Sequence, residues 1–448
     1  MATELQAMPN QHRVVILGGG FGGLYAAQAL KHAPVAVTLI DKRNFHLFQP
    51  LLYQVATGSL SPGEIAAPLR SVLSKQKNTQ VLLGEAVDID PHGKKILLRD
   101  GAQIGYDSLI VTTGSQSTYF GHNEWNRWAP PLKTVEDALN VRQKILLAFE
   151  VAERTMDPAE RRAWLTFVIV GAGATGVELG GALGEIANHT LKTEFRSIRP
   201  QEAKILIVDT ASRVLVTYPE DLSRKAEESL IHLGVRTRGG LKVTCIDDRG
   251  VTVEDKTGKQ EHIASKTVLW AAGVAIGSFG HTLAERTGAP TERSGKIQVA
   301  PDLTIPGFPD IFVAGDLAFV KNKKGVPLPG VAQVAMQGGK YAATAIIKRL
   351  EGKPVKPFHY FDKGDLAVIG RARAVANVFG VHMAGLPAWL VWLFVHLMYI
   401  VEFQSRILVF VQWGLQYLTY GRGARLITAP SSAGAIQETE ALEAAHKL

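Results

Sequence analysis

Residues 14–41 read VVILGGGFGGLYAAQALKHAPVAVTLID, and the order of strand, turn and helix patterns in these residues indicates the fold class. The apolar run at 14–17 is typical of a buried parallel strand, and residues 24–30 have the composition and period of a helix. A second strand is expected at 35–40, and it ends in Asp41. A strand, a glycine-rich turn, a helix, a second strand and an acid, in this order, predict a dinucleotide-binding unit.

The glycines of this turn carry the chemistry. They allow a tight turn, and they let the backbone N–H groups at the helix N-terminus approach a pyrophosphate. The acid at the end of the second strand is expected to accept hydrogen bonds from a ribose diol. The residues expected to hold this first nucleotide are Gly18, Gly20, Phe21, Gly23, Asp41 and Lys42.

The same unit occurs a second time. Residues 166–170 (TFVIV) predict a buried strand, 171–176 (GAGATG) the glycine turn, and 177–194 a helix. The next strand, at 204–208, ends in Asp209, later than the usual spacing because of the long helix and a linker. The residues expected to hold the second nucleotide are Gly171, Gly173, Thr175, Gly176, Glu178 and Asp209.

The acid of the second unit bears on which nucleotide binds. Asp209 suits a free ribose hydroxyl and repels a 2′-phosphate, which favours NAD over NADP. Arg213 lies close by in the sequence and works against this preference.

A third segment, 310–316 (DIFVAGD), resembles the second FAD motif of flavoproteins with two dinucleotide folds. Two further segments, 106–114 (YDSLIVTTG) and 268–273 (VLWAAG), resemble the strands that return the chain between domains in that superfamily. The resemblance implies that the FAD domain is built from both ends of the chain, with an NAD domain inserted. It adds the FAD- or NAD-site residues Thr113, Gly114, Gly273, Gly315 and Asp316.

Composition restricts the chemistry. The chain of 448 residues is 46% hydrophobic and 20% charged, as expected for a globular protein. Its one cysteine, Cys245, is too few for a disulfide framework, a thiolate zinc site, a Cys-ligated iron–sulfur cluster or a dithiol redox pair. Redox chemistry therefore needs a bound organic cofactor. The net charge of +8 is spread along the chain, and we find neither a nucleic-acid motif nor metal-ligand spacing.

Several stretches resemble the type II NADH:quinone oxidoreductases, which are single-subunit NADH dehydrogenases that do not pump protons. They are 44–54 (NFHLFQPLLYQ), 176–185 (GVELGGALGE), 332–337 (AQVAMQ), 360–370 (YFDKGDLAVIG) and an apolar C-terminal tail. The resemblance implies that NADH passes hydride to non-covalently bound FAD, and that two electrons then reach a membrane quinone. It also implies a homodimer in a respiratory chain.

The expected fold class is α/β, with two Rossmann-type dinucleotide-binding domains in a glutathione-reductase-like architecture and a C-terminal amphipathic helical membrane anchor. The expected parts are the first part of the FAD-binding domain at 1–115, a connecting segment at 116–160, the NAD(H)-binding domain at 161–275, the second part of the FAD domain with a quinone-site helix at 276–375, membrane-associating helices at 376–428 and a polar tail at 429–448.

A helix is expected at 331–350, and its N-terminus is expected to face the flavin through Ala332 and Gln333. Gln333 and Gln337 lie on one face, four residues apart, where they are able to bond a quinone carbonyl or simply to face solvent. Gly338 and Gly339 depart from the family, where a second polar side chain is expected.

Two more residues are candidates for the catalytic site. Glu178 lies near the expected N-terminus of its helix, where it is expected to interact with the helix dipole. The family resemblance implies the alternative, that it acts near the nicotinamide and quinone. Glu185 is expected to be structural. Lys363 matches the lysine of the family's FDKG stretch, and it either faces the quinone or is a loop lysine.

The tail is apolar from 385 to 401 and again from 407 to 420. Its uninterrupted run is too short for a spanning helix, and its Trp and Tyr residues fit a bilayer interface. Residues 386–425 are therefore expected to contact the membrane surface, with Arg406, Arg422 and Arg425 meeting anionic headgroups. The alternative is two helices packed on the FAD domain or at a dimer interface. The expected location is peripheral, on the cytoplasmic face of the cell membrane or the equivalent face of an organelle membrane.

Two other functions remain open on the sequence. One is a flavin reductase without redox cysteines that serves a soluble electron carrier and does not need the tail. The other is a redox-gated FAD- and NAD-binding interaction protein.

Overall fold

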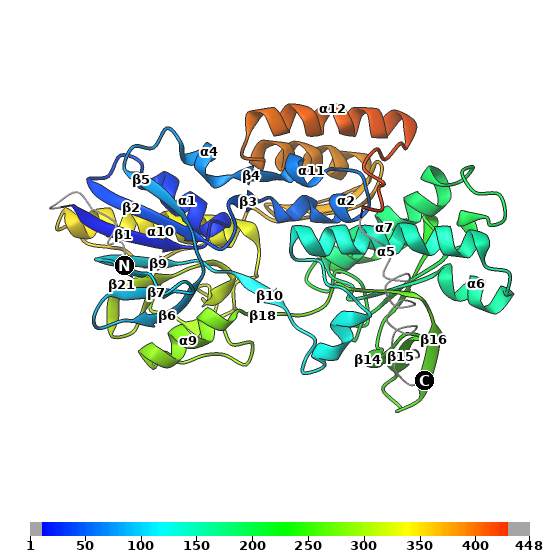
Figure 1. The fold of residues 1–448 in the computed structure, drawn as a ribbon, viewed down its shortest axis with the longest axis horizontal. Coiled ribbons are helices and arrows are strands. Elements are labelled where there is room, and N and C mark those ends of the chain that lie inside the picture. Colours follow the sequence, from blue (N-terminus) through cyan, green and yellow to red (C-terminus); the bar gives the residue numbers. More distant parts are fainter. Residues whose placement is uncertain (1–10, 429–448) are drawn as a thin grey trace, which may run out of the picture. The chain divides into compact units, whose positions relative to one another are not determined.

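The computed structural model describes residues 11–428, which form two compact units, each built from separate segments of the chain (Figure 1). Unit 1 contains residues 11–47, 66–116 and 274–362, and unit 2 contains residues 48–65, 117–273 and 363–428. The polar tail expected at 429–448 lies outside the described residues.

Unit 1 is organised around a six-stranded sheet of order β20-β21-β9-β1-β2-β5. Its strands are β1 (His12–Leu17), β2 (Val35–Asp41), β5 (Thr79–Leu83), β9 (Ser108–Val111), β20 (Thr304–Ile305) and β21 (Phe308–Val313). All neighbours pair in parallel except β20, which is antiparallel to β21. Apolar runs such as β9 are buried along their whole length because both faces of a parallel sheet are covered.

Helices α1 (Phe21–Ala29) and α10 (Ala332–Leu350) pack closely against one another in unit 1 (Figure 1). A Cβ atom at Gly339 would meet the carbonyl oxygen of Gly22 at 2.0 Å, and one at Gly338 would meet the Cβ of Ala314 at 3.0 Å. The two glycines that depart from the family pattern therefore stand where larger side chains would push α10 away from α1 and β21.

The opposite side of the core of unit 1 is closed by a small antiparallel sheet, β6-β7-β8, and by α9. The remaining elements of unit 1 are β3 (Phe45–Leu47), β4 (Ala66–Pro68), α4 (Leu69–Leu73), β6 (Ala86–Asp90), β7 (Lys95–Leu98), β8 (Gln103–Gly105), β10 (Ser115–Ser117, whose last residue falls in unit 2), β18 (Val274–Ile276), α9 (Ser278–Thr287), β19 (Ile297–Gln298), a 3₁₀ turn (Gly315–Leu317) and β22 (Ala318–Phe319).

Unit 2 contains a second parallel sheet, of order β13-β12-β11-β17. Its strands are β11 (Thr166–Val170), β12 (Lys204–Val208), β13 (Val235–Arg238) and β17 (Thr267–Trp270). Helix α7 (Ala174–Glu185) follows β11 directly, so the order of strand, turn, helix and strand repeats that of unit 1.

The helix predicted over 177–194 is shorter than expected. The α-helix ends at Glu185, and a single π turn follows over Ile186–Thr190. The Nδ2 of Asn188 donates to the carbonyl oxygens of Gly184 and Leu233, at 3.0 and 2.9 Å, which ties this turn to Leu233, the residue that follows the helix Glu220–His232.

The rest of unit 2 surrounds this sheet with helices and two small antiparallel sheets, β14-β15-β16 and β23-β24-β25. The elements are α2 (Leu52–Ala56), α3 (Pro62–Ile65), α5 (Val135–Arg154), α6 (Pro158–Trp164), α8 (Glu220–His232), β14 (Lys242–Ile246), β15 (Gly250–Glu254), β16 (Gln260–Ala264), β23 (Asp365–Gly370), β24 (Arg373–Val378), β25 (Val381–Ala384), α11 (Leu386–Tyr399) and α12 (Phe403–Thr419), with 3₁₀ turns at Gln49–Leu51, Asn123–Arg127 and Pro200–Glu202. Cys245 lies within β14.

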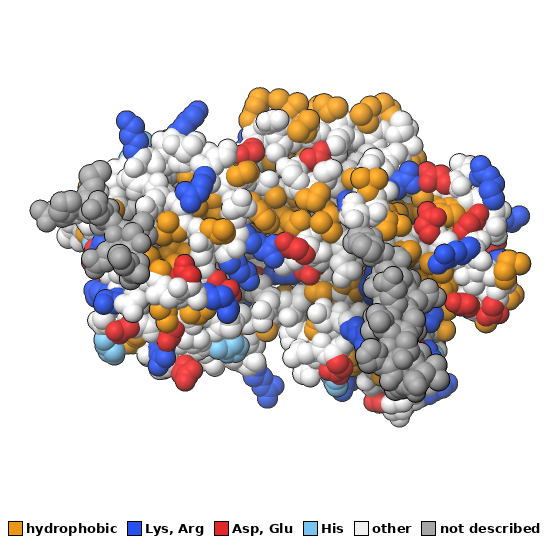
Figure 2. All heavy atoms as spheres, viewed as in Figure 1, with side chains coloured by type: hydrophobic (Ala, Val, Ile, Leu, Met, Phe, Trp, Pro, Cys, Tyr) orange, Lys and Arg blue, Asp and Glu red, His pale blue; other side chains and the backbone are white. Residues whose placement is uncertain are grey.

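The apolar tail forms the two helices α11 and α12, which pack against each other through Trp392 and Trp413. Figure 2 shows hydrophobic side chains gathered over the outer surface of α12. Large exposed apolar residues of the two helices are Leu386, Leu390, Phe394, Met398, Phe403, Ile407, Leu408, Phe410, Val411, Leu415 and Leu418. Within residues 11–428, no helix combines the length and apolarity needed to cross a membrane.

Candidate functional site

The three glycines of the first turn have different structural roles. Gly18 adopts φ +97°, and a Cβ atom there would meet the carbonyl oxygen of Thr112 at 2.5 Å. A Cβ at Gly23 would meet the carbonyl oxygen of Gly18 at 1.8 Å, so neither position accepts a side chain. A Cβ at Gly20, the N-cap of α1, would meet no heavy atom within 4 Å. Space is therefore open beside the N-terminus of α1, where backbone N–H groups suit a phosphate.

The second turn repeats this geometry in unit 2. Gly171 adopts φ +110°, and its Cβ would meet the carbonyl carbon of Ala271 at 2.7 Å. A Cβ at Gly176 would meet the carbonyl oxygen of Gly171 at 1.8 Å, whereas Gly173 faces open space. Two turns with the same close approaches and the same opening supply two sites of the kind that hold a nucleotide pyrophosphate.

Each strand-ending acid is held against its own glycine turn. Asp41 accepts a hydrogen bond from the backbone N–H of Gly19 at 2.5 Å, and Asp209 accepts one from that of Ala172 at 2.6 Å. Burial raises the pKa of Asp41, while the N–H groups of Gly19 and Arg43 act in the opposite direction. Both carboxyl groups therefore lie beside the turn, where a ribose attached to the pyrophosphate would be.

Arg213 is bonded to the loop that contains it. Its guanidinium donates to the carbonyl oxygens of Val216 at 3.0 Å, Tyr218 at 3.1 Å and Leu215 at 3.3 Å. These three bonds hold the guanidinium over its own loop, which reduces its capacity to bind a 2′-phosphate near Asp209.

The third predicted motif places Asp316 in the 3₁₀ turn after β21, where its carboxylate accepts a hydrogen bond from the hydroxyl of Ser115 at 2.5 Å. Gly315 adopts φ +74° and packs against Ala335 in the first turns of α10, so Asp316 and the start of α10 are neighbours. Sequence reasoning missed Ser115, although it directly follows Gly114 of the predicted strand end.

His46 is a second residue that the sequence motifs did not identify. The imidazole is buried beside the first glycine turn, with its Nδ1 3.0 Å from the carbonyl oxygen of Gly19 and its ring edge-on to Phe21. Because a carbonyl oxygen only accepts, Nδ1 carries the proton and Nε2 is an acceptor. Nε2 has no partner among the described residues. A buried acceptor without a partner, together with the space beside Gly20, fits a nucleotide with hydroxyl groups such as FAD.

The predicted catalytic residues are divided between the units. In unit 1, the side-chain amide of Gln337 makes two hydrogen bonds with the backbone of Phe361. Its Nε2 donates to the carbonyl oxygen of Phe361, and its Oε1 accepts from the N–H of Phe361, each at 2.9 Å. Gln333 lies half-buried in the first turn of α10. In unit 2, Lys363 is exposed and donates to the hydroxyl of Tyr399 at 2.9 Å.

A cavity of about 100 Å³ lies within unit 2, enclosed by residues from α2, α7, β23, α11 and α12 and from the segment after α12. This volume exceeds that of a single buried water. Six aromatic residues, two acids and two arginines are among the residues that line it: Tyr53, Glu178, Glu185, Arg371, Trp389, Trp392, Trp413, Tyr417, Tyr420 and Arg422.

Glu178 is one of the two acids that line this cavity. It lies in the second turn of α7 and not at the helix N-terminus, so the helix-dipole interpretation of this residue is wrong. Burial raises the pKa of the Glu178 carboxyl group to about 8, although the hydrogen bond from the backbone N–H of Val368 lowers this pKa. Near neutral pH the carboxyl group is therefore mostly protonated.

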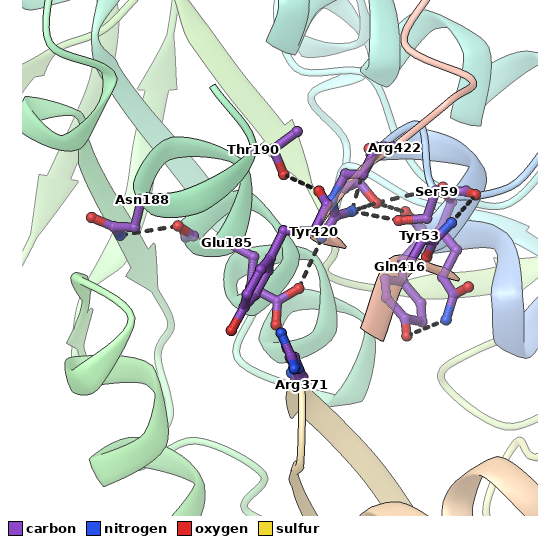
Figure 3. Close-up of polar contacts among 12 residues, drawn as sticks. Tyr53, Ser59, Glu185, Asn188, Thr190, Arg371, Gln416, Tyr420 and Arg422 are labelled. Atoms are coloured by element: carbon purple, nitrogen blue, oxygen red, sulfur yellow. Dashed lines mark hydrogen bonds and ion pairs between the residues drawn. The ribbon is translucent and has the colours of Figure 1, made fainter. Parts of the chain in front are cut away.

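Arg422 is buried, with 8% of its surface exposed, and does not face lipid headgroups as the sequence predicted (Figure 3). Its guanidinium pairs with Glu185 at 2.9 Å and donates to the hydroxyls of Thr57 at 2.9 Å and Ser59 at 2.6 Å. Arg425 likewise pairs with Glu194, at 2.7 Å. Both arginines therefore fasten the segment after α12 to unit 2, and Glu185 is structural, as expected.

Arg371, Tyr417 and Tyr420 build another wall of the cavity. The guanidinium carbon of Arg371 lies 4.1 Å from the ring centre of Tyr417 and 4.5 Å from that of Tyr420. The backbone N–H of Arg371 donates to Glu185 at 2.5 Å. Stacking between two rings keeps this cation at the cavity wall.

Sequence reasoning missed most residues that build this cavity. Tyr53 and Arg371 lie inside or next to stretches that carried the family resemblance, and this was the available signal. For Tyr420 and Arg422 the signal pointed elsewhere, because aromatic and basic residues at the end of an apolar tail are typical of a membrane surface.

Comparison with known proteins agrees with this geometry. A family model described as pyridine nucleotide-disulphide oxidoreductase matches residues 12–339, and one described as NDH2 C-terminal domain matches residues 363–422. The type II NADH:quinone oxidoreductase Ndh of Mycobacterium tuberculosis is 46% identical over 94% of this chain and 91% of its own length. NdhA of the same organism is also 46% identical, over 95% of this chain and 91% of its length. The chain belongs to the type II NADH:quinone oxidoreductase family.

Solved structures agree on the fold. NDH2 from Plasmodium falciparum in complex with NADH superposes with a TM-score of 0.84 at 20% identity, covering 92% of this chain and 99% of that chain. The sulfide:quinone oxidoreductase from Aquifex aeolicus superposes with a TM-score of 0.70 at 17% identity, covering 96% and 95%. Family membership confirms the predicted family, the α/β class with two dinucleotide folds and the prediction of an FAD-dependent oxidoreductase. Because the chain has one cysteine, this oxidoreductase works without the disulphide in the broader family's name.

Proposed function

We propose that this type II NADH:quinone oxidoreductase carries two electrons from NADH through FAD to a quinone at the surface of a membrane, without pumping protons. The observation that carries the proposal is the cavity of unit 2, where the carboxyl group of Glu178, with a pKa of about 8, faces aromatic walls. Aromatic walls suit a flat quinone ring, and a protonated acid suits a reaction that consumes protons.

Unit 1 would hold FAD, which when bound supplies the chemistry that accepts hydride and passes electrons on. Gly18, Gly20 and Gly23 would give the pyrophosphate its place at the N-terminus of α1, and Asp41 would bond the ribose. The residues that we propose to complete the site are Phe21, Lys42, His46, Thr113, Gly114, Ser115, Gly315, Asp316, Ala332 and Gln333.

The segment 161–275 would bind NADH. Gly171, Gly173 and Gly176 form the turn, Asp209 bonds the adenosine ribose, and Thr175 and Gly273 lie along the same path. The proposal favours NADH over NADPH because Asp209 repels a 2′-phosphate and Arg213 is held by its own loop carbonyls.

Quinone reduction adds one proton to each of two carbonyl oxygens. Glu178 would hold one of these protons on its carboxyl group, facing the cavity, because its raised pKa keeps it in the acid form near neutral pH. Gln333, Gln337 and Lys363 stay predicted quinone-site residues. The bonds of Gln337 to Phe361 support a role in holding the chain that leads to Lys363.

Peripheral membrane attachment is the other part of the proposal. The exposed apolar side chains of α11 and α12 support it, since exposed apolar patches of this kind are typical of interaction surfaces. The homodimer and the cytoplasmic face of the membrane stay predictions from the family resemblance.

The experiment that tests the function is anaerobic stopped-flow spectroscopy of the flavin-loaded protein in detergent. The flavin absorbance should fall on addition of NADH and recover on addition of a ubiquinone with one isoprenoid unit or of menadione. Absorbance that falls but does not recover with either quinone would overturn the proposal and favour a reductase for a soluble carrier or a redox-gated binding protein.

A further inference from the structure

A chain of hydrogen bonds with a fixed direction leads into the cavity of unit 2. The indole Nε1–H of Trp413 donates to Oε1 of Gln54 at 2.8 Å, and Nε2 of Gln54 donates to the hydroxyl oxygen of Tyr53 at 2.8 Å. An indole N–H only donates, so the amide of Gln54 must turn its oxygen toward Trp413 and its NH₂ group toward Tyr53. The direction of the whole chain follows from Trp413.

Because of this direction, the hydroxyl of Tyr53 accepts one hydrogen bond and still has its own proton to donate. The oxygen already accepts from Gln54, so its own proton needs an acceptor, and none is present among the described residues. Tyr53 is 7% exposed and lines the same cavity as Glu178. Burial, and to a lesser degree the negative charge of ionised Glu178, raises the pKa of Tyr53 well above its ordinary value. The hydroxyl therefore keeps its proton and remains a donor.

We propose that Tyr53 is a further catalytic residue, whose hydroxyl donates a hydrogen bond to a carbonyl oxygen of the quinone head group, with Gln54 and Trp413 as positioning residues. The proposal rests on the proposed function. The acceptor it requires is a carbonyl oxygen on a flat ring, because the donor lies between aromatic walls that include Trp392 and Trp413. Tyr53 gives up no proton in this role. It orients the carbonyl and stabilises negative charge that develops on the oxygen.

The test compares Y53F with Y106F. Tyr106 is buried in the core of unit 1, and its hydroxyl has no hydrogen-bond partner in residues 11–428, so Y106F removes the same group without removing a hydrogen bond made within that range. Y53F should raise the KM for a ubiquinone with one isoprenoid unit roughly five- to tenfold, the loss expected for a single hydrogen bond. It should leave flavin content and the rate of flavin bleaching by NADH unchanged, and Y106F should change none of these.

The direction of the chain is tested separately with Q54E. A carboxylate accepts from both neighbours, so it would still bond Trp413 but would also draw the proton of Tyr53 away from the cavity. Q54E should therefore weaken quinone binding as much as Y53F does. The double variant Y53F/Q54E should bind quinone as tightly as Y53F alone does. Quinone binding is read independently of turnover from quenching of tryptophan fluorescence, because Trp389, Trp392 and Trp413 line the cavity.

Two failures are distinguishable. If the wild-type flavin is not reoxidised by quinone, the proposed function fails. If wild-type turnover is normal while Y53F binds quinone as tightly as Y106F does, or if Q54E and Y53F weaken binding additively, the assignment of Tyr53 is overturned and the proposed function stands.

Discussion

The guanidinium of Arg422 lies 2.9 Å from the carboxylate of Glu185 inside unit 2, although 237 positions of sequence separate the two residues. Two hydroxyls complete the shell of the guanidinium, and the N–H of Ala424 donates to the carbonyl oxygen of Gly58 at 3.1 Å. These contacts hold the segment that follows α12 in place, and its residues 420–422 are part of the wall of the cavity.

We expect R422A to destabilise the protein by about 3–5 kcal/mol, because it leaves the carboxylate of Glu185 buried without its partner. The measurement is the thermal unfolding of the flavin-loaded protein. The control is R425A, which breaks the more exposed pair with Glu194 and should cost about 1 kcal/mol or less. Equal shifts for the two variants would show that the Arg422 pair contributes no more than a surface pair.

A pH dependence follows from Glu178. Its pKa of about 8 lies above its ordinary 4.5, so the acid form predominates below pH 8 and is lost above it. The rate of quinone reduction should therefore fall as the pH rises through about 8. In E178Q this rate should be lower and should not change across the same range, while flavin bleaching by NADH is unchanged. The same inflection in E178Q would assign it to another group.

The same shift predicts a change in stability. The folded protein holds the proton of Glu178 more tightly than the unfolded chain does, so stability contributed by this group falls as the pH rises from 4.5 to about 8. E178Q removes this dependence, so its melting temperature should exceed that of the wild type at pH 8. At pH 5 the difference in melting temperature between E178Q and the wild type should be smaller. A gain in melting temperature that does not depend on pH would contradict a raised pKa.

The choice of nucleotide should depend on the charge of Asp209. D209N keeps an acceptor for the N–H of Ala172 but removes the negative charge that repels a 2′-phosphate. We expect the ratio of kcat/KM for NADPH to that for NADH to rise about tenfold, a value typical of one lost charge interaction. D255N, which removes a charge from the exposed turn between β15 and β16, should leave the ratio unchanged. An unchanged ratio in D209N would place the discrimination elsewhere.

Membrane binding should depend on the outer surface of α12. Phe410 and Leu418 are 56% and 75% exposed, so F410S/L418S should leave the melting temperature nearly unchanged. Sedimentation with vesicles of phosphatidylcholine and phosphatidylglycerol should show binding weakened roughly tenfold or more, because two large side chains no longer enter the bilayer. L83S, a similar change in β5 of unit 1, is the control. If L83S bound vesicles as weakly as F410S/L418S does, membrane binding would not depend specifically on the surface of α12.

The glycine turns could be predicted from sequence because their roles are local. Each turn lies between a strand and a helix that are adjacent in the chain, and the close approaches at Gly23 and Gly176 are to the first glycine of the same turn. The acids that end β2 and β12 were found for the same reason, since each is bonded to the turn of its own unit.

The cavity could not be predicted because its walls come from distant segments. Glu178 looked like a helix-terminal acid, and only its packing beside β23 and the tail raises its pKa. Arg422 looked like a membrane-facing cation, since nothing in its neighbourhood in the sequence indicates Glu185 as its partner. Gly338 and Gly339 looked like a lost polar contact, but Gly339 is required by the close packing of α1 and α10, and Gly338 lies against Ala314, directly after β21.

The pair of helices α11 and α12 is fastened to unit 2 at both ends. At the start, the N–H of Gly385 donates to the carbonyl oxygen of Ala374 in β24 at 2.9 Å, and at the end Arg422 is locked to Glu185. These contacts hold the hairpin to β24 at one end and to α7 at the other. In the proposed attachment to a bilayer, the depth and tilt of the hairpin would therefore be set by the protein and not by the lipid, so every molecule would present its cavity to the bilayer at the same angle.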